Sequence, residues 1–219
     1  MNFKKKGLLS QSMYIPPTFV ETDQHKLQEF IEHHSFATLV SHHGGAPVAS
    51  HLPLLLEREE GPHGQLICHM ARANPQWQHA DGQEMLAIFH GPHAYISPTW
   101  YEAEAVVPTW NYVAVHVYGT FRLDDSRSRR LEIVRRYVDF YESTLDPPWS
   151  LDNADDEFID KLLDAIVGFR ITIDRIEGKW KLNQNHDPQR RTKVIRALRE
   201  AGNEDRDQIA DLMSETMEK

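Results

Sequence analysis

Cysteine and long hydrophobic runs are both scarce in this sequence. Cys68 is the single cysteine among 219 residues, which excludes a disulfide within the chain and a cysteine-based zinc site. An unpaired cysteine is typical of a reducing compartment, so we expect the protein to be cytoplasmic. The longest uncharged apolar stretches, such as residues 52–56, fall far short of the roughly 20 residues that a membrane helix needs. We therefore expect no membrane partner.

Positive charge is also in short supply. The chain has 24 Lys and Arg against 33 Asp and Glu, and a formal net charge of −9. Such a chain has no general attraction for phosphate backbones, so any contact with nucleic acid must be local. Apolar residues make up 40% and charged residues 26% of the chain, values that are typical of a folded protein with a sizeable core.

The sequence lacks the motifs of several enzyme classes. It has no GxGxxG after a strand, no P-loop and no GxSxG, which disfavours a classical dinucleotide fold and a serine hydrolase. Several histidine pairs suggest metal ligands: His33 with His34, His42 with His43, and His90 with His93. Because no HExxH motif occurs, and because adjacent strand histidines point to opposite faces, we expect no metal site.

The first twelve residues differ from the rest of the chain. Three lysines at positions 4–6 precede only Gly7, Leu8 and Leu9 before polar residues begin, which is too short for the ~7–15-residue apolar region of a signal peptide. We interpret residues 1–12 as a flexible extension and Met13 as the more natural start.

The first half of the chain predicts an antiparallel sheet or barrel. Asp23 is a suitable N-cap for a helix over residues 23–34. Strand-like runs separated by glycine and proline then follow at residues 36–41, 47–57, 65–70, 85–90, 93–97 and 113–123. Gly44-Gly45 and residues 59–64 are predicted to close the first two pairs.

The second half predicts helices around one long β segment. Helical spacing covers residues 126–145 and 154–165, and alternation over 166–182 predicts a strand or hairpin. Two further helices, 189–201 and 204–217, are joined at Gly202-Asn203 as a helical hairpin. We divide the chain into an extension (1–12), a core domain (13–186) and a helical appendage (187–219).

The first candidate site is the segment 67–77, in which a strand runs directly into a short helix. Asn74 caps the predicted helix over 74–81, and Pro75 suits its first position. With His69 and Arg72 beside it, this helix start makes a seat for phosphate. The alternative is a capped helix with an exposed arginine. Cys68 is expected to be a small buried filler.

Two further segments place polar or aromatic side chains where a ligand would need them. Ser50 and His51 lie inside an apolar strand, so they must find partners in the protein or in a ligand. Residues 90–101, together with Trp110, Asn111 and Tyr112, are dense in aromatic side chains, which suits a pocket wall or a subunit contact.

The tail carries the one concentrated basic run. Its members, with no acid among them, are Arg190, Arg191, Lys193, Arg196 and Arg199. This stripe is a candidate for contact with DNA phosphates. Across residues 187–219, however, eight acids balance seven bases, so a solvated helix face is the alternative.

Several long segments resemble the PaiB family of FMN-binding negative transcriptional regulators. They are MYIPPTF (13–19), FATLVS (36–41), ASHLPLLL (49–56), HMARANPQW (69–77), IFHGPHAYISPTWY (88–101), VPTWNYVAVHVYG (107–119), AIVGFRI (165–171) and IEGKWKLNQN (176–185). The resemblance implies a split β-barrel related to pyridoxamine-phosphate-oxidase-like flavoproteins, and a homodimer with flavin sites between its subunits. It also implies repression of genes for protease production and sporulation.

The resemblance assigns roles to the candidate residues. It implies that the flavin ring is flanked by Ser50, His51 and Leu52, and that the phosphate end is served by His69, Arg72 and Asn74. It implies that the partner subunit completes the site with Trp110, Asn111 and Tyr112, and that Lys181 and Gln184 close the pocket. The oxidase relatives use a richer set of Arg, Lys and Ser at the phosphate, whereas this segment has one arginine.

We therefore expect an α+β protein, an antiparallel FMN-binding split β-barrel with peripheral helices and a C-terminal helical hairpin. It is predicted to act as a dimeric regulatory binding module. A flavin-dependent oxidoreductase of the pyridoxamine-phosphate-oxidase-like class, or a haem-binding split-barrel protein, is the alternative, because fold does not settle function. No residue stands out as a general acid or base with a positioned partner, so catalytic residues stay unassigned.

Overall fold

A computed structural model describes residues 12–218 of the chain. The predicted extension, apart from Ser12, lies outside the described residues. The chain forms two compact units. The larger unit comprises Asp23–Gly91 and Ala114–Ile176, and the smaller unit comprises the described residues up to Thr22, Pro92–Val113 and the chain from Glu177 onward.

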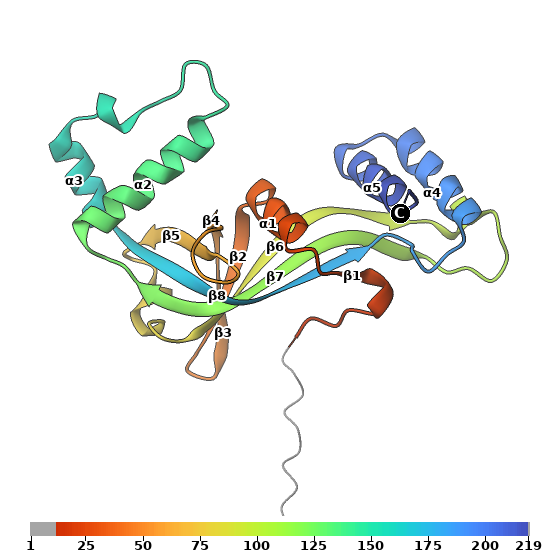
Figure 1. The fold of residues 1–219 in the computed structure, drawn as a ribbon, viewed down its shortest axis with the longest axis horizontal. Coiled ribbons are helices and arrows are strands. Elements are labelled where there is room, and N and C mark those ends of the chain that lie inside the picture. The colour runs from red at the N-terminus through yellow and green to blue at the C-terminus, as the bar shows by residue number, and fades with distance from the viewer. Residues whose placement is uncertain (1–11, 219) are drawn as a thin grey trace, which may run out of the picture. The chain divides into compact units, whose positions relative to one another are not determined.

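The described strands form an eight-stranded sheet (Figure 1). Its strands are β1 (Val20–Glu21), β2 (Phe36–His43), β3 (Ala46–Pro53), β4 (Leu55–Glu57), β5 (Gln65–Ala71), β6 (Glu84–Ile96), β7 (Thr109–Leu123) and β8 (Ile166–Lys181). Their order is β3-β2-β6-β7-β8-β5-β4, and β1 pairs with β8. The pairs β2–β3, β2–β6, β4–β5 and β5–β8 are antiparallel. Strands β3 and β5 also lie against each other, as expected for a sheet that curls into a barrel.

One turn and one close approach in the larger unit depend on glycine. The β2–β3 hairpin turns at Gly44 (φ 58°) and Gly45 (φ 84°), the left-handed conformation that a two-residue hairpin loop needs. Gly168 of β8 permits a close approach, because a Cβ there would lie 2.7 Å from the carbonyl oxygen of Asp124 and 3.0 Å from Ile133 Cδ1. The start of α2 can therefore lie directly on β8.

The larger unit has an apolar core between its strands and helices. Phe89, Phe121 and Phe169 are fully buried, and the rings of Phe121 and Phe169 stack with centroids 4.7 Å apart. The helices of this unit are α1 (Gln24–His33), α2 (Arg127–Glu142) and α3 (Asp156–Asp164), with 3₁₀ turns η2 (Pro75–His79) and η4 (Leu151–Asn153). Their N-caps are Asp23, Ser126 and Asp155, whose side chains accept hydrogen bonds from backbone amides of the first turn.

The smaller unit is built around the C-terminal helical hairpin. Its helices are η1 (Pro17–Phe19), η3 (Pro98–Tyr101), α4 (Pro188–Ala201) and α5 (Glu204–Glu215). Helices α4 and α5 pack together, and α4 also packs on η3. Gly202 (φ 48°) ends α4, and Asn203 caps α5, as predicted.

The predicted α+β class and most predicted elements are confirmed. Three details differ. The run 47–57 is divided into β3 and β4 at Leu54, whose amide donates to the carbonyl of Ser35 instead of to a strand. The runs 85–90 and 93–97 form one strand, β6; Pro92 lies beyond the residues that pair with β2, so its missing N–H interrupts no bond of that pair. The helix predicted over 74–81 is the shorter η2.

One open alternative is also decided, because the segment predicted over 166–182 is the single strand β8 (Ile166–Lys181) and no hairpin. Among the described residues, no helix is both long and apolar enough to cross a membrane.

Candidate functional site

The end of β5 and the start of η2 bring several predicted residues together. Asn74 caps η2 by accepting from the amide of Gln76 (3.0 Å), and its Nδ2 donates to Ser50 Oγ on β3 (2.8 Å). The Gln76 side chain is buried, and its Nε2 donates to Ser41 Oγ (3.0 Å) and to the carbonyl of Leu39 (3.2 Å) on β2. Ser50 therefore has a partner in the protein, and Gln76 is a positioning residue that the sequence did not indicate.

The residues expected to flank the flavin ring divide between two faces of β3. Side chains alternate along a strand, so Ser50 and Leu52 share one face, and His51 lies on the other. His51 is exposed, and its Nδ1 is hydrogen-bonded to Thr38 Oγ1 at 3.1 Å. Ser50 and Leu52 are half-buried. The face that carries Ser50 is the one that meets Asn74.

His69 on β5 has a ring nitrogen that the described protein leaves unused. Its Nδ1 is buried and has no hydrogen-bond partner among the described residues. The imidazole lies 5.0 Å from the ring of Tyr137 on α2. Burial lowers the pKa of His69, because removal from water disfavours the charged form. The folded protein therefore favours the neutral imidazole, whose Nδ1 is left without a partner.

The neighbouring Cys68 is buried, as predicted. Its Sγ donates to the carbonyl of Pro53 (3.2 Å). Burial raises the pKa of Cys68 to about 12, so the residue is a thiol, not a thiolate, at neutral pH. It contributes packing and no nucleophile.

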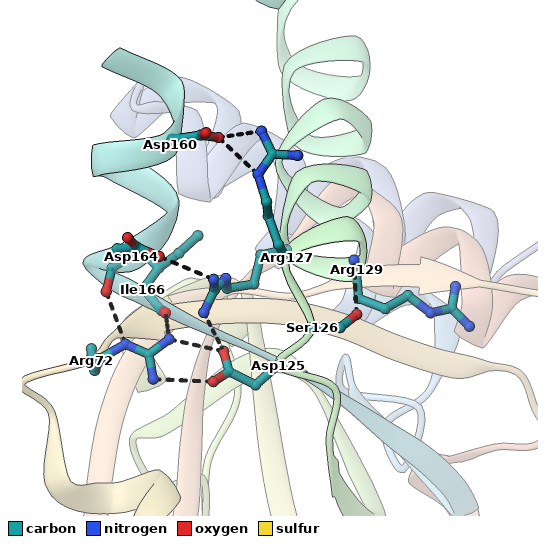
Figure 2. Close-up of polar contacts among 9 residues, drawn as sticks. Arg72, Asp125, Ser126, Arg127, Arg129, Asp160, Asp164 and Ile166 are labelled. Carbon is teal, nitrogen blue, oxygen red and sulfur yellow. Dashed lines mark hydrogen bonds and ion pairs between the residues drawn. The ribbon is translucent and has the colours of Figure 1, made fainter. Parts of the chain in front are cut away.

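Arg72 donates hydrogen bonds to two connections of the larger unit, the one between β7 and α2 and the one between α3 and β8 (Figure 2). Its Nη1 and Nη2 donate to the Asp125 carboxylate, each at 3.1 Å. Its Nε donates to the carbonyl of Asp164 (2.9 Å), and Nη2 also donates to that of Ile166 (2.7 Å). Asp125 lies between β7 and α2, and Asp164 and Ile166 lie where α3 meets β8. The sequence left open whether Arg72 binds phosphate or is simply exposed. In the structure Arg72 has an acidic partner, Asp125.

A second arginine extends this contact into what we call the arginine–aspartate network: Arg72, Asp125, Arg130 and Asp164. The buried Arg130 donates to Asp125 Oδ1 and to Asp164 Oδ1, each at 3.2 Å. Outside the network, Arg127 pairs with Asp160 between α2 and α3. Sequence analysis missed Asp125 and Arg130, because acids beside a helix cap and arginines in a helix are common and carry no specific signal.

The remaining predicted cofactor residues lie in the smaller unit. Trp110 is 52% exposed and Tyr95 is 42% exposed. Their rings meet edge to face at 5.8 Å, and His93 lies 6.1 Å from Trp110. Lys179 lies 5.3 Å from the ring of Tyr112. His93 and Tyr95 are two residues apart on β6, and Trp110 and Tyr112 are two residues apart on β7, so each pair shares one face of its strand. We call these four residues the aromatic face.

Lys181 lies beside the aromatic face. Its Nζ donates to Thr109 Oγ1 (2.6 Å) and to the carbonyl of Trp110. Burial, together with the charge of Lys179, lowers the pKa of Lys181.

Two predicted residues of the smaller unit are placed differently from Trp110 and Tyr112. Asn111 is completely buried, and its Nδ2 lies 3.3 Å from Met213 Sδ on α5. Strand alternation puts it on the opposite face from Trp110. Gln184 braces its own turn, since it accepts from the amide of Leu182 (2.7 Å) and donates to the carbonyl of Trp180 (2.6 Å).

The basic stripe of α4 is only partly available to a partner. Arg191 is buried and donates to the carbonyl of Met213 (3.0 Å) and to Thr216 Oγ1, so it joins α4 to α5. The other four bases each have an acidic neighbour: Arg190 with Asp187, Lys193 with Glu102, Arg196 with Glu102 and Glu200, and Arg199 with Asp211. Among residues 12–218, no group of three or more potential ligands gathers to hold a metal ion.

Comparison with known proteins identifies the family. The family model described as "Putative FMN-binding domain" matches residues 13–175. The chain belongs to this family. It is 36% identical over 210 residues to "Protease synthase and sporulation protein PAI 2" of Bacillus subtilis, covering 94% of this chain and 99% of that protein. A protein of Emericella nidulans is 30% identical over 203 residues, 76% of this chain and 81% of its own length.

Solved structures of the same fold support the split-barrel assignment. The flavocytochrome Anf3 of Azotobacter vinelandii superposes with a TM-score of 0.55 at 15% identity, over 74% of this chain and 69% of that one. The FAD and heme binding protein of Mycobacterium smegmatis superposes with a TM-score of 0.54 at 16% identity, over 84% and 80%. At these identities the likeness concerns the fold alone.

The described residues fit the cofactor that the family description names. His69 offers a buried nitrogen without a protein partner, and Ser50 and Asn74 supply a hydroxyl and an amide. Arg72 supplies a guanidinium, a group that binds phosphate in a forked geometry. Because this guanidinium already holds Asp125, a phosphate at Arg72 has to share it with the carboxylate or replace the carboxylate.

The half-buried His69 predicts a loss of stability on acidification. Its folded-state pKa lies below the unfolded value of about 6.5. As the pH falls through 6.5, the unfolded chain gains a proton that the folded chain does not, so stability decreases until the folded pKa is reached. His69→Gln should remove this contribution, which is at most about 1.4 kcal/mol per pH unit for one group.

Urea denaturation between pH 7.5 and 5.5 measures this contribution. His51→Gln, at an exposed position of β3, is the matched control and should keep the wild-type pH dependence. Burial also lowers the pKa values of His34 and His186, so some dependence should remain in His69→Gln. The full wild-type slope in that variant would contradict the prediction.

Proposed function

We propose that this protein is an FMN-binding negative transcriptional regulator of the PaiB type, acting as a cytoplasmic homodimer. The observation that carries the proposal is the 36% identity to the sporulation protein PAI 2 across 99% of that protein's length. A match over 94% of this chain extends beyond residues 13–175, which the family model covers. The flavin- and haem-containing structural neighbours share only the fold, and so favour neither the oxidoreductase nor the haem alternative.

In this proposal the larger unit holds the phosphate end of FMN through His69, Arg72 and Asn74, and the face of β3 that carries Ser50 and Leu52 flanks the ring. When bound, FMN supplies a ring system that takes up and releases electrons. The chain itself binds and orients the cofactor. The orphan nitrogen of His69 and the guanidinium of Arg72 support this assignment.

The phosphate assignment predicts a preference for FMN over riboflavin, which lacks the anion. Arg72→Ala should weaken FMN binding by about 1.5–3 kcal/mol, the range for hydrogen bonds to charged groups, and should leave riboflavin binding unchanged. Flavin fluorescence titration measures both affinities. Arg127→Ala, which removes an arginine of the exposed pair with Asp160, is the control. Equal affinity of the wild type for both flavins would contradict the assignment.

The homodimer is proposed to use the aromatic face. Exposed aromatic side chains are enriched at interfaces and dominate their energetics, and Trp110 and Tyr95 form such a pair. The occupant is a second copy of the chain, since a two-fold contact sets one surface against itself. Only Trp110 and Tyr112 of the predicted partner-subunit set lie on this face.

We therefore expect a dimer at micromolar concentration in sedimentation velocity, and Trp110→Ala should shift the equilibrium towards monomer by about 2 kcal/mol or more, as for an interface hot spot. Trp149→Ala is the control, because Trp149 is similarly exposed but lies in the larger unit. An unchanged dimer in Trp110→Ala would place the interface elsewhere.

Direct contact with DNA is proposed for the bases of α4 that reach solvent. Arg196 and Arg199 are exposed and Arg190 and Lys193 are half-buried, whereas Arg191 belongs to the α4–α5 contact. Their acidic neighbours must give way to phosphate, which makes this contact strongly dependent on salt. The larger unit is not required for it.

Replacing Arg190, Lys193 and Arg196 together by alanine should weaken binding to the DNA upstream of the protein's own gene, and should reduce the salt slope by about one unit per lost contact. Gel shifts at low and moderate salt measure both. The control replaces three exposed bases of α2 and α3, Arg129, Arg135 and Lys161. If the wild type gives no shift at either salt, regulation does not proceed through direct DNA contact.

A further inference from the structure

The arginine proposed to bind the FMN phosphate already has internal partners for most of its N–H donors. A guanidinium has five N–H donors, and four of those of Arg72 point at Asp125, Asp164 and Ile166. The pair with Asp125 is forked, with both distances 3.1 Å. Two parallel N–H groups of this kind bind a carboxylate and a phosphate in the same way. Asp125 thus occupies the donors that a phosphate would use.

Asp125 does not depend on Arg72 alone. Its Oδ1 also accepts from Arg130 (3.2 Å), whose side chain is only 10% exposed. If Arg72 turned to another anion, the Asp125 carboxylate would keep this cationic partner, and Arg130 would keep both of its acids. The exchange therefore leaves no buried charge unpaired, which is the costly outcome when an ion pair is broken. Arg72, 35% exposed against 10% for Arg130, is the more accessible of the two arginines.

We propose that Asp125 is an internal competitor for the FMN phosphate, and that phosphate binding at Arg72 loosens the α3–β8 and β7–α2 junctions. The inference rests on the proposed function and adds regulation of the same site. When Arg72 binds the phosphate, its bonds to the carbonyls of Asp164 and Ile166 and to Asp125 are exchanged for bonds to the ligand. FMN occupancy is thereby communicated to helices α2 and α3.

The coupling works in both directions, because linkage between two equilibria is reciprocal. Ordering of the α3–β8 junction by Arg72 opposes FMN binding, and FMN binding opposes that ordering. Helix α3 carries Phe158 and Leu162 more than half exposed, so a change in its attachment alters an apolar surface. The network thus connects cofactor occupancy to a part of the protein that does not touch the cofactor.

The decisive variant is Asp125→Asn, which keeps an oxygen for the arginines and removes the negative charge. It should bind FMN about tenfold more tightly, as expected when one charge-assisted competitor is weakened, and should bind riboflavin with wild-type affinity. Asp160→Asn is the matched control, because Asp160 pairs with Arg127 outside the network and should change neither affinity. Fluorescence titration with both flavins gives the four comparisons.

Hydrogen exchange on the wild type is an independent measurement that does not require the variant to fold. FMN should increase amide exchange over residues 156–166, and riboflavin should not. Helix α1, in the same unit, is the internal reference. Increased protection of residues 156–166 by FMN would overturn the proposed loosening.

The outcomes separate this inference from the proposed function. If neither flavin binds the wild type, the proposed function fails. If FMN is preferred over riboflavin and Asp125→Asn leaves FMN affinity unchanged or lower, the competitor role of Asp125 fails and the proposed function stands. Tighter binding of both flavins by Asp125→Asn would also overturn it, because the effect would not then concern the phosphate.

Discussion

The antiparallel pairing of β5 with β8 is the constraint on which the candidate site depends. The register sets Ala71 opposite Ile166 and His69 opposite Gly168. Arg72, the next residue after β5, is therefore carried to the α3–β8 junction, where its backbone amide donates to the carbonyl of Ala165 (2.8 Å) and its side chain reaches Asp164 and Ile166. The absence of a side chain at Gly168 lets the β7–α2 junction approach the same place. A one-residue shift would dismantle all of these contacts.

The charge distribution explains why a sequence-based map of basic residues is a poor guide to this protein's partners. Arginines in the larger unit are mostly paired across elements, as Arg72 and Arg130 are with Asp125, and those of α4 other than Arg191 are paired with acids of the smaller unit. Within residues 12–218, most arginines thus have an acidic neighbour. Specific recognition has to compete with these internal pairs.

Local features were predictable, and contacts between distant residues were not. Asn74 and Pro75 indicate the start of η2. The polar Ser50 in an apolar strand indicates that a hydrogen-bond partner is needed, and that partner is Asn74. Arg72 has partners at positions 125, 164 and 166, and no local pattern encodes separations of this size.

Arg191 is a different kind of omission. It precedes the buried Val194, Ile195 and Leu198 at helical spacing, so its position on the buried face of α4 was readable from periodicity. Because arginine is mostly exposed in folded proteins, the residue type suggested a solvent-facing position instead.

The burial of Cys68 gives the chain a built-in reporter of its own opening. It is the single thiol in the sequence, it is fully buried on β5, and its high pKa keeps it protonated. Thiol reagents react with thiolates, so the folded larger unit shields the sulfur both sterically and chemically. The rate of covalent labelling therefore measures how often the β5 region separates from its neighbours. No engineered probe is needed to follow that fluctuation.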